Sequence, residues 1–408
     1  MLKKTDEIKV MRDPLHGYIH VQYQVIWDCI NAKEFQRLRR IHQLGGDFQV
    51  YHTAEHSRFA HSLGVYEVVR RMIYEVKGLS DCLSEYEMVT VMLAGLLHDI
   101  GHGAFSHAFE SITTCRHEVF TRRIILEDSQ IHDILMKVDK NLPHDVASII
   151  SYEHKNDILN QIVSGQLDAD RMDYLLRDAY FTGTSYGHFD LERILRTMRV
   201  KDQRLVVKQS GIYSVENYIM ARYHMYWQVY LHPIARSYEG LLVCIFKRMK
   251  YLFIHDPEKV KDVEMFHPFL QEGYEVTNEE LFYLDESAAM YGFIKLCKSE
   301  DAILRDLAHR ILNRQLFEYK TVEDESEIEE IIQNVKEAGF DSDYYIFQDA
   351  VTQIAYSPYK QSEAHHNIWV LLEDGSVKEL SQVSDIVKAV SKVKSKQDKK
   401  VYYPSYTC

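Results

Sequence analysis

Apolar residues recur mainly at helical spacing between Val25 and Asp256. Gly78 and Gly101 follow two of these stretches, at positions where glycine commonly ends a helix. A short alternating run around Asp202-Gln203 instead predicts a β-hairpin over 199–207. The pattern therefore predicts a mainly α fold. The stretches with helical spacing cover 27–42, 58–77, 84–98, 117–126, 170–179 and 215–248.

The pattern changes toward the end of the chain. A second helical block, richer in acidic residues, is expected over about 278–330, and two alternating runs on either side of 373–376 predict a hairpin. Ser384 is a candidate N-cap for a last short helix, and 388–400 reads as a basic, solvated tail. We therefore expect a helical core with a small C-terminal α+β appendage. The predicted parts are residues 1–256, 257–330 and 331–408.

Composition narrows the class of protein. No apolar run approaches the roughly 18 residues that a membrane span needs, and the first residues lack the apolar segment of a secretory signal. Six scattered cysteines without a C-x-x-C pair favour reduced thiols, so we expect a cytoplasmic protein. The net charge of −13 disfavours a general nucleic-acid binder, although a local cluster of basic residues would suffice for a nucleotide.

Four His-Asp dipeptides occur, of which His98-Asp99 stands out. The pairs that begin at His132, His144 and His255 are expected on solvated helix faces or turns. His98-Asp99 instead ends an almost wholly apolar helix, where burial of both groups costs free energy unless they are paired or bind a metal. The dipeptide alone leaves a buried ion pair and a metal site equally open.

Two further segments favour the metal site. His61 lies near the start of the expected helix over 58–77, and Asp170 lies in a segment whose carboxylates cannot all face water if its leucines pack. With His98 and Asp99 these residues make a set of two imidazoles and two carboxylates. Such a set suits a divalent Mn, Mg, Fe, Ni or Co ion with open coordination positions, and suits structural zinc poorly.

Together, these residues and their flanking segments resemble the HD-domain phosphohydrolase superfamily. The run from Arg12 to His232 is similar to its dNTP triphosphohydrolase branch, with bacterial dGTP-activated enzymes as the nearest likeness. The resemblance covers more than half of the chain and implies an HD-domain helical core that hydrolyses a dNTP to a deoxynucleoside and inorganic triphosphate. The matching blocks are Phe35–Arg39, Gln43–Gly46, Arg58–Gly64, Gly95–Gly103 and Asp168–Asp178.

The resemblance also implies roles for single residues. His61, His98, Asp99 and Asp170 are the implied metal ligands. His107, with His102 beside it, is implied to act on the scissile phosphate ester, and His117 and Glu118 to orient it. The implied contacts to triphosphate and sugar are Arg58, Arg171, Tyr174, Asp178, Arg222 and Tyr226. Those that exclude a 2′-hydroxyl are Gln43, Leu44 and Tyr230. Taken singly, each of these residues has an ordinary structural alternative in a core or on a surface.

Regulation is a further expectation from the resemblance. Relatives assemble into oligomers that bind activating guanine nucleotides at subunit junctions, so a homodimer or homotetramer activated by dGTP or GTP is expected. Gln36, Arg39, Arg193 and Lys208 stand where that site's contacts would fall. Asn31 replaces an aspartate that reads the guanine edge in one branch, and an amide offers one acceptor and one donor where a carboxylate offers two acceptors. Ser210 replaces a lysine.

Three alternatives stay open at this level. HD proteins also hydrolyse cyclic nucleotides, nucleoside monophosphates and (p)ppGpp. A nucleotide-sensing module without turnover is disfavoured by the complete ligand set and by His107. A single-stranded nucleic-acid binder is disfavoured by the net charge, although the basic segment 388–400 keeps it open.

Overall fold

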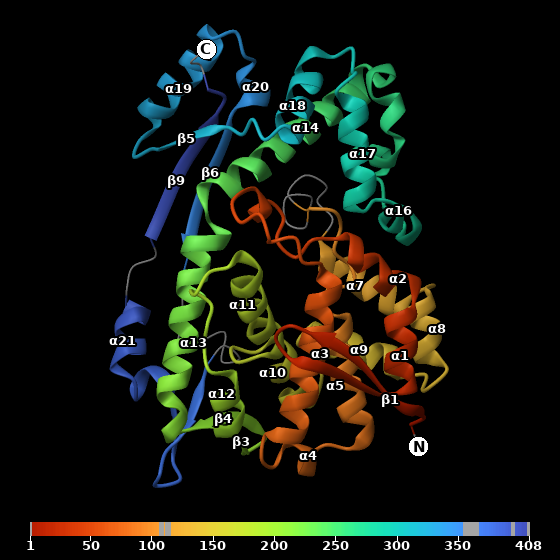
Figure 1. Ribbon diagram of the computed structural model, residues 1–408, viewed down its shortest axis with the longest axis vertical. Helices are drawn as coiled ribbons and strands as arrows, with labels where there is room; N and C mark the ends of the chain where they lie inside the picture. The colour runs from red at the N-terminus through yellow and green to blue at the C-terminus, as the bar shows by residue number, and fades with distance from the viewer. Residues whose placement is uncertain (1, 106–109, 111–115, 354–366, 393–395, 406–408) are drawn as a thin grey trace.

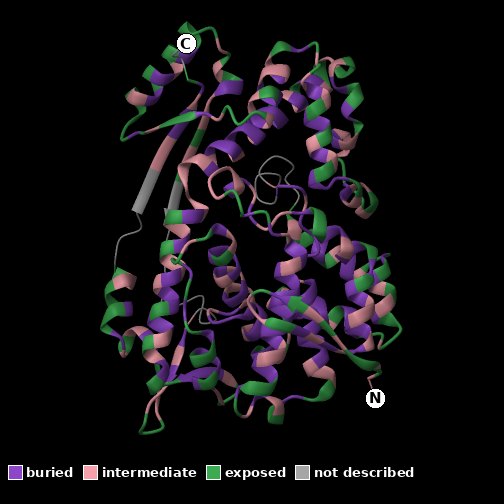
Figure 2. Ribbon diagram, in the orientation of Figure 1, coloured by how far each residue is buried: buried purple, intermediate pink, exposed green. Residues whose placement is uncertain are grey.

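The structure is a computed structural model that describes residues 2–105, 110, 116–353, 367–392 and 396–405, and only the backbone of 351–353 and 396–398. A body of helices carries the N-terminal hairpin, and a smaller part built of helices and a three-stranded sheet extends from it (Figure 1). Buried residues concentrate inside the helical body (Figure 2). The expectation of a mainly α fold is confirmed. Among the described helices, none combines the length and the apolar character needed to cross a bilayer.

Three helices that meet at the centre of the body position the candidate site. Ser84 begins one of them with a capping box, since it and Glu87 satisfy each other's backbone N–H groups. Asp168 caps another by accepting from the N–H of Arg171 at 2.8 Å. These helices are α3 (Arg58–Glu75), α5 (Glu85–Leu97) and α11 (Ala169–Thr182). Around them lie α4 (Leu79–Cys82), α7 (His117–Leu126), α8 (Gln130–Met136), α9 (Leu142–Ile150), α10 (Asp157–Ser164) and α12 (Leu191–Thr197).

Two stretches expected as single helices are each divided. The stretch 27–42 breaks at Ala32, whose ψ of 146° is extended, and this separates α1 (Gln24–Asn31) from α2 (Lys33–Arg37). The prediction of one helix over 215–248 is wrong. Pro233 cannot donate a backbone hydrogen bond, and the backbone of His232 before it is extended. The stretch divides into α13 (Ile212–Met225), a π-helical turn (Tyr226–Tyr230) and α14 (Pro233–His255).

Two hairpins lie on the helical body. The expected hairpin is confirmed, with Asp202 and Gln203 at left-handed φ values of 50° and 57° between β3 (Met198–Lys201) and β4 (Arg204–Lys208). The other hairpin joins β1 (Lys4–Asp13) to β2 (Gly17–Tyr23).

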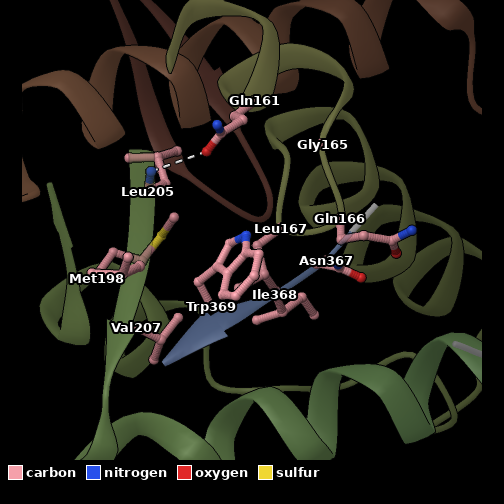
Figure 3. Close-up of a pocket in the computed structure, with 11 residues that line it drawn as sticks. Gln161, Gly165, Gln166, Leu167, Met198, Leu205, Val207, Asn367, Ile368 and Trp369 are labelled. Carbon is pink, nitrogen blue, oxygen red and sulfur yellow. Dashed lines mark hydrogen bonds between the residues drawn. The ribbon is translucent and has the colours of Figure 1, made fainter. Parts of the chain in front are cut away.

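The expected C-terminal hairpin, β7 (Trp369–Leu371) with β8 (Val377–Glu379), shares a sheet with β3 and β4. Strand β7 pairs in parallel with β4, with Val370 opposite Val207. The cavity beside Trp369 has a volume of only about 30 Å³, and a hydrogen bond from Leu205 N–H to Gln161 Oε1 joins two of the residues that line it (Figure 3). A cavity of this size holds a water molecule rather than a nucleotide.

The C-terminal part corrects two expectations. The helical block over 278–330 is interrupted by β5 (Glu318–Thr321). The basic segment 388–400 is not a solvated tail, because β9 (Lys396–Tyr403) is the central strand between β5 and β6 (Phe347–Gln353). Its residues Val401 and Tyr402 are fully buried. Ser384 does accept the N–H of Val387 at the start of α21 (Asp385–Lys392), as expected. The predicted domain boundaries stay a prediction.

The remaining helices pack on α14, on the C-terminal sheet, on one another and, for one of them, on α7 (Figure 1). They are α15 (His267–Leu270), α16 (Asn278–Tyr283), α17 (Glu286–Leu296), α18 (Ala302–Leu312), α19 (Glu325–Glu337) and α20 (Ser342–Tyr345).

Candidate functional site

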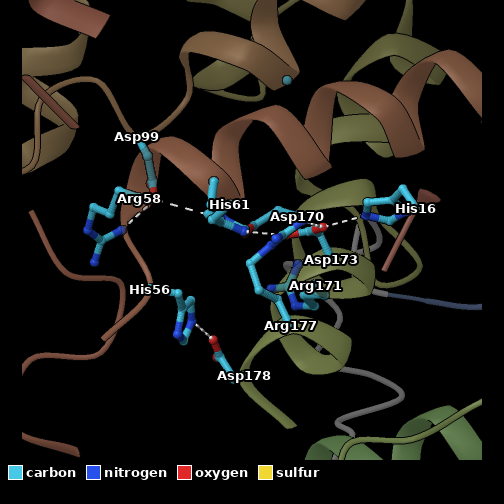
Figure 4. Close-up of polar contacts among 12 residues, drawn as sticks. His16, His56, Arg58, His61, Asp99, Asp170, Arg171, Asp173, Arg177 and Asp178 are labelled. Carbon is cyan, nitrogen blue, oxygen red and sulfur yellow. Dashed lines mark hydrogen bonds and ion pairs between the residues drawn. The ribbon is translucent and has the colours of Figure 1, made fainter. Parts of the chain in front are cut away.

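The four predicted metal ligands converge where α3, α5 and α11 meet, and Figure 4 labels three of them, His61, Asp99 and Asp170. His61 Nε2 lies 3.1 Å from Asp170 Oδ1 and 3.9 Å from Asp99 Oδ2. His98 Nε2 lies 3.4 Å from Asp99 Oδ1 and 3.6 Å from Asp170 Oδ1. Residues that are up to 109 positions apart in the chain thus present two imidazole nitrogens and two carboxylates to one point.

Both imidazoles are held in the tautomer that a metal ligand requires. His98 donates from Nδ1 to the carbonyl of Gly95 at 2.9 Å, and its buried Nε2 has no hydrogen-bond partner among the described residues. His61 donates from Nδ1 to Asp173 Oδ2 at 2.9 Å, which turns its Nε2 toward Asp99 and Asp170. Because Nδ1 is occupied in both rings, Nε2 is the nitrogen that would bind a metal ion in exchange for its proton, and the set therefore fits a divalent cation.

The electrostatics of the cluster favour an added positive charge. Burial opposes ionisation of Asp99, yet His98, Arg58 and His102 hold its pKa well below the usual range. Burial also opposes protonation of His61, but its contacts with Asp170 and Asp173 raise its pKa to about 10. The carboxylates therefore stay ionised and attract a cation. A divalent metal ion would supply that charge in exchange for the protons.

A second cluster of histidines adjoins the ligands. The rings of His102 and His117 stack with centroids 3.7 Å apart, and His102 Nε2 lies 3.4 Å from Asp99 Oδ1. Burial, together with the nearby Arg58, lowers the pKa of His102 well below its usual value. Glu110 binds His117 Nδ1, whereas Glu118 is exposed and lies 3.6 Å away. His107 lies outside the described residues, so the roles given to these groups stay predictions.

A cavity of about 430 Å³ opens beside the ligands, a size typical of small-molecule sites. Seven of the predicted substrate residues line it: Gln43, Leu44, Arg58, Tyr174, Asp178, Tyr226 and Tyr230. Sequence reasoning missed six further lining residues: Gly45, Asp47, Phe105, Leu231, Arg236 and Glu239.

Arg171 and Arg222 are not among the residues that line this cavity. Arg171 forms an ion pair with Asp168 and donates to the carbonyl of Gly165 at 2.6 Å. Arg222 donates to Gln166 Oε1 at 2.9 Å, and its guanidinium lies 5.9 Å from the ring centroid of Tyr226, which does line the cavity. Both arginines therefore lie next to the cavity and are engaged by other groups.

Asp178 is held on both of its oxygens. His56 Nε2 lies 2.8 Å from Oδ1, and the hydroxyl of Tyr230 donates to Oδ2 at 2.7 Å. The ring of His56 stacks on Phe181. Sequence reasoning missed His56, although it stands only two residues before the matching block that begins at Arg58.

The residues expected to bind an activating nucleotide form two separate groups. Gln36 donates to the carbonyl of Ile30 and Arg39 donates to Gln36, both at the α1–α2 junction near Asn31. Arg193 donates to the carbonyl of Ser210, close to Lys208 at the end of β4. These groups lie on different sides of the molecule (Figure 1), so one chain does not bring them together.

A buried network behind His61 was also missed. Asp173 contacts His61, His16 and Arg177, and Arg177 in turn contacts Asp13. A weak signal existed, since Asp173 and Arg177 are four residues apart and hence on one helix face. Sequence spacing could not reveal their partners in the N-terminal hairpin, His16 and Asp13, because these are remote in the sequence.

Comparison with known proteins places this site in a family. A model of the HD domain matches residues 58–178, and a model of the HD associated region matches 189–266. The uncharacterized protein YwfO of Bacillus subtilis is 47% identical over 98% of this chain and 93% of its own length. The deoxynucleoside triphosphate triphosphohydrolase SAMHD1 homolog of Dictyostelium discoideum is 30% identical over 63% of this chain and 52% of its own length.

Solved structures agree with this assignment. A phosphohydrolase from Bacteroides thetaiotaomicron superposes with a TM-score of 0.84 at 29% identity, covering 98% of this chain and 100% of the other. The comparisons do not assign the bacterial dGTP-activated branch, which stays a prediction. The ligand set lies wholly within the matched HD domain, and the chain belongs to the HD-domain superfamily of metal-dependent phosphohydrolases.

Proposed function

We propose that this chain hydrolyses deoxynucleoside triphosphates to a deoxynucleoside and inorganic triphosphate. The observation that carries the proposal is the continuity between the ligand set and the cavity, since Asp99, Asp170 and Arg58 line the same space as Gln43, Leu44 and Tyr230. This arrangement suits a substrate with a phosphate chain at one end and a sugar and base at the other. The similarity to the triphosphohydrolase of Dictyostelium discoideum supports the same substrate class.

The ligand set would hold a divalent ion, which activates water and polarises phosphoryl oxygens. Arg58, which is buried and paired with Asp99, presents a guanidinium suited to phosphate oxygens. Departure of the 5′-oxygen needs a proton from an imidazole. We assign this proton to His107, with His102 beside it, and the orientation of that group to His117 and Glu118.

The sugar would lie between the tyrosines and the Gln43-Leu44 segment. Tyr230 and Asp178 are already hydrogen bonded to each other, so the hydroxyl of Tyr230 has a defined position. A rigid wall at that point excludes a 2′-hydroxyl by steric contact. We further propose that Tyr174, Tyr226, Arg171 and Arg222 contact the triphosphate and sugar.

A product assay tests the function. Protein loaded with Mn²⁺ is incubated with each dNTP, with and without dGTP, and the products are separated by ion-exchange chromatography. We expect inorganic triphosphate and deoxynucleoside from the wild type and none from Asp99→Ala. Asp133→Ala, at the exposed carboxylate of another His-Asp pair, is the matched control and keeps wild-type turnover. Pyrophosphate or orthophosphate as the first product, or turnover of cyclic nucleotides, nucleoside monophosphates or (p)ppGpp alone, would contradict the proposal.

We propose in addition that a homodimer or homotetramer brings Asn31, Gln36 and Arg39 of one subunit to Arg193 and Lys208 of another, where dGTP or GTP binds. The separation of the two groups within one chain supports this. Light scattering with and without dGTP tests it, and a monomer under both conditions would contradict it.

A further inference from the structure

The metal centre has a second layer that reaches the N-terminal hairpin. Asp173 on α11 accepts four hydrogen bonds, and its side chain is fully buried. Oδ2 accepts from His61 Nδ1 at 2.9 Å and from Arg177 Nε at 2.8 Å. Oδ1 accepts from Arg177 Nη2 at 2.9 Å and from His16 Nε2 at 2.6 Å (Figure 4). Asp173 therefore has no freedom to rotate away from His61.

His16 is delivered to this site by a specific turn. Asp13 Oδ1 accepts the N–H groups of Leu15 and His16 at 2.9 and 3.1 Å, and this closes the turn between β1 and β2. Gly17 completes the turn with a φ of 71°, a conformation that favours glycine. The other oxygen of Asp13 accepts from Arg177 Nη1 at 3.0 Å. The turn is thus tied to α11 by two contacts, one through His16 and one through Arg177.

Burial makes these contacts consequential. The side chains of His16, Asp173 and Arg177 are 2%, 0% and 0% exposed, so no water competes for their hydrogen bonds. An unpaired carboxylate at this depth would be costly, and the tight packing leaves it no alternative position. A change at His16 therefore alters the hydrogen bonding of Asp173 directly.

We propose that His16 is a positioning residue for the metal centre, acting through Asp173 on the orientation and tautomer of the ligand His61. Its Nε2–H fixes Oδ1 of Asp173, so that Oδ2 stays in line with His61 Nδ1 and the lone pair on His61 Nε2 faces the ion. The hairpin over 4–23 is thereby part of the metal site and not only a cover for it. The inference rests on the metal centre of the proposed function and not on its substrate.

Mn²⁺ affinity, measured by the paramagnetic resonance of free Mn²⁺, tests the proposal. We expect His16→Ala to weaken binding by about 10-fold to 100-fold, the range usual for groups that orient a ligand. His16→Gln places an amide N–H near the position of Nε2 and should restore most of the affinity. His20→Ala is the matched control on the same hairpin, since His20 faces Glu67 at 3.6 Å and is 43% exposed.

A second control separates positioning from loss of stability. Val21 is fully buried on β2, and Val21→Ala should lower the free energy of unfolding of the metal-free protein while Mn²⁺ affinity stays at the wild-type value. Wild-type affinity in folded His16→Ala would overturn the proposal, as would an equal loss of affinity in Val21→Ala or a wild type that binds no divalent ion. If Mn²⁺ binding responds as expected but no dNTP is hydrolysed, only the proposed function fails.

Discussion

Gly64 lies directly against Asp173, so closely that a Cβ atom at position 64 would be 1.9 Å from Oδ1 of that carboxylate. The same atom would be 2.4 Å from Nη2 of Arg177. A side chain at this point of α3 would occupy the space in which the buried network behind His61 forms. The absence of a side chain at position 64 is therefore what allows α3 and α11 to approach beside the candidate metal ligands.

Gly64→Ala should consequently destabilise the protein. Either the carboxylate or the helix must shift, and forced contacts of this kind in a core cost about 1–3 kcal/mol, with the lost hydrogen bonds adding to that. Urea unfolding of the metal-free protein measures the loss. Gly45→Ala is the matched control, because a Cβ there meets its nearest neighbour at an ordinary 3.5 Å. Equal stability of the two variants would show that Gly64 has room.

Metal ions should stabilise the folded chain. A ligand that binds only the native state at 100 times its Kd adds about 2.7 kcal/mol. We expect Mn²⁺ to raise the Tm of the wild type and EDTA to reverse the rise. Asp99→Ala should show no rise, and the exposed Asp133→Ala should behave like the wild type. A rise of the same size in Asp99→Ala would place the ion elsewhere.

Stability should also depend on pH through His42. Glu286 at the start of α17 accepts the N–H of His42 at 3.0 Å, binds its ring and accepts the N–H of Phe105 at 3.3 Å. The hydrogen bond with Glu286 raises the pKa of His42 above the value of about 6.5 in an unfolded chain. The stabilisation is therefore fully present below about pH 6.5 and is lost as pH rises through the folded-state pKa.

The free energy of unfolding of the wild type should exceed that of His42→Gln by more at about pH 5.5 than at about pH 8.5. Urea unfolding at the two pH values gives this difference, and groups that titrate in both proteins cancel. His52→Gln, at an exposed position, serves as the control for replacing a histidine with glutamine. If the difference in free energy of unfolding between the wild type and His42→Gln is the same at both pH values, the raised pKa of His42 is contradicted.

Tyr230 should govern discrimination against ribonucleotides. Its hydroxyl is held by Asp178 at 2.7 Å at the wall of the cavity. Tyr230→Ala removes that wall, and we expect kcat/KM for GTP relative to dGTP to rise about 10-fold or more, as is usual when a pocket loses a steric contact. Steady-state assays of both nucleotides measure the ratio. Tyr180→Ala, on the exposed side of α11, should leave the ratio unchanged; an unchanged ratio in Tyr230→Ala would remove Tyr230 from sugar selection.

Strand β9 should be essential to the C-terminal part. Val401 is fully buried in the central strand of its sheet, so Val401→Asp places an uncompensated carboxylate in the core. We expect a loss of more than about 2 kcal/mol in the free energy of unfolding. Lys392→Asp, at an exposed position on α21, makes a larger change in charge and should cost little. A harmless Val401→Asp would restore the view of this segment as a solvated tail.

The sequence by itself determined the helical core and singled out the candidate metal ligands. Helix hydrogen bonds join residues four apart in the sequence. The apolar periodicity that predicts a helix, and a cap such as Ser84 with Glu87, can therefore both be read from one short segment. The candidate ligands lie at the ends of these helices. His61 is near the start of α3, His98 and Asp99 directly follow α5, and Asp170 is in the first turn of α11. Residue type and local helix position, together with the resemblance of the flanking segments, were enough to predict them.

The tertiary structure alone decided which residues surround those ligands and where the last strand goes. His16 and Asp173 are 157 positions apart, and β9 pairs Tyr402 with both Tyr319 and Phe347. Such partners are chosen by packing between distant segments, and nothing in the local pattern of lysines around 396–400 reveals a buried strand. The physical reason is the range of the interactions: helices form from neighbours in sequence, whereas sheets and buried polar networks form only once the chain has brought remote groups together.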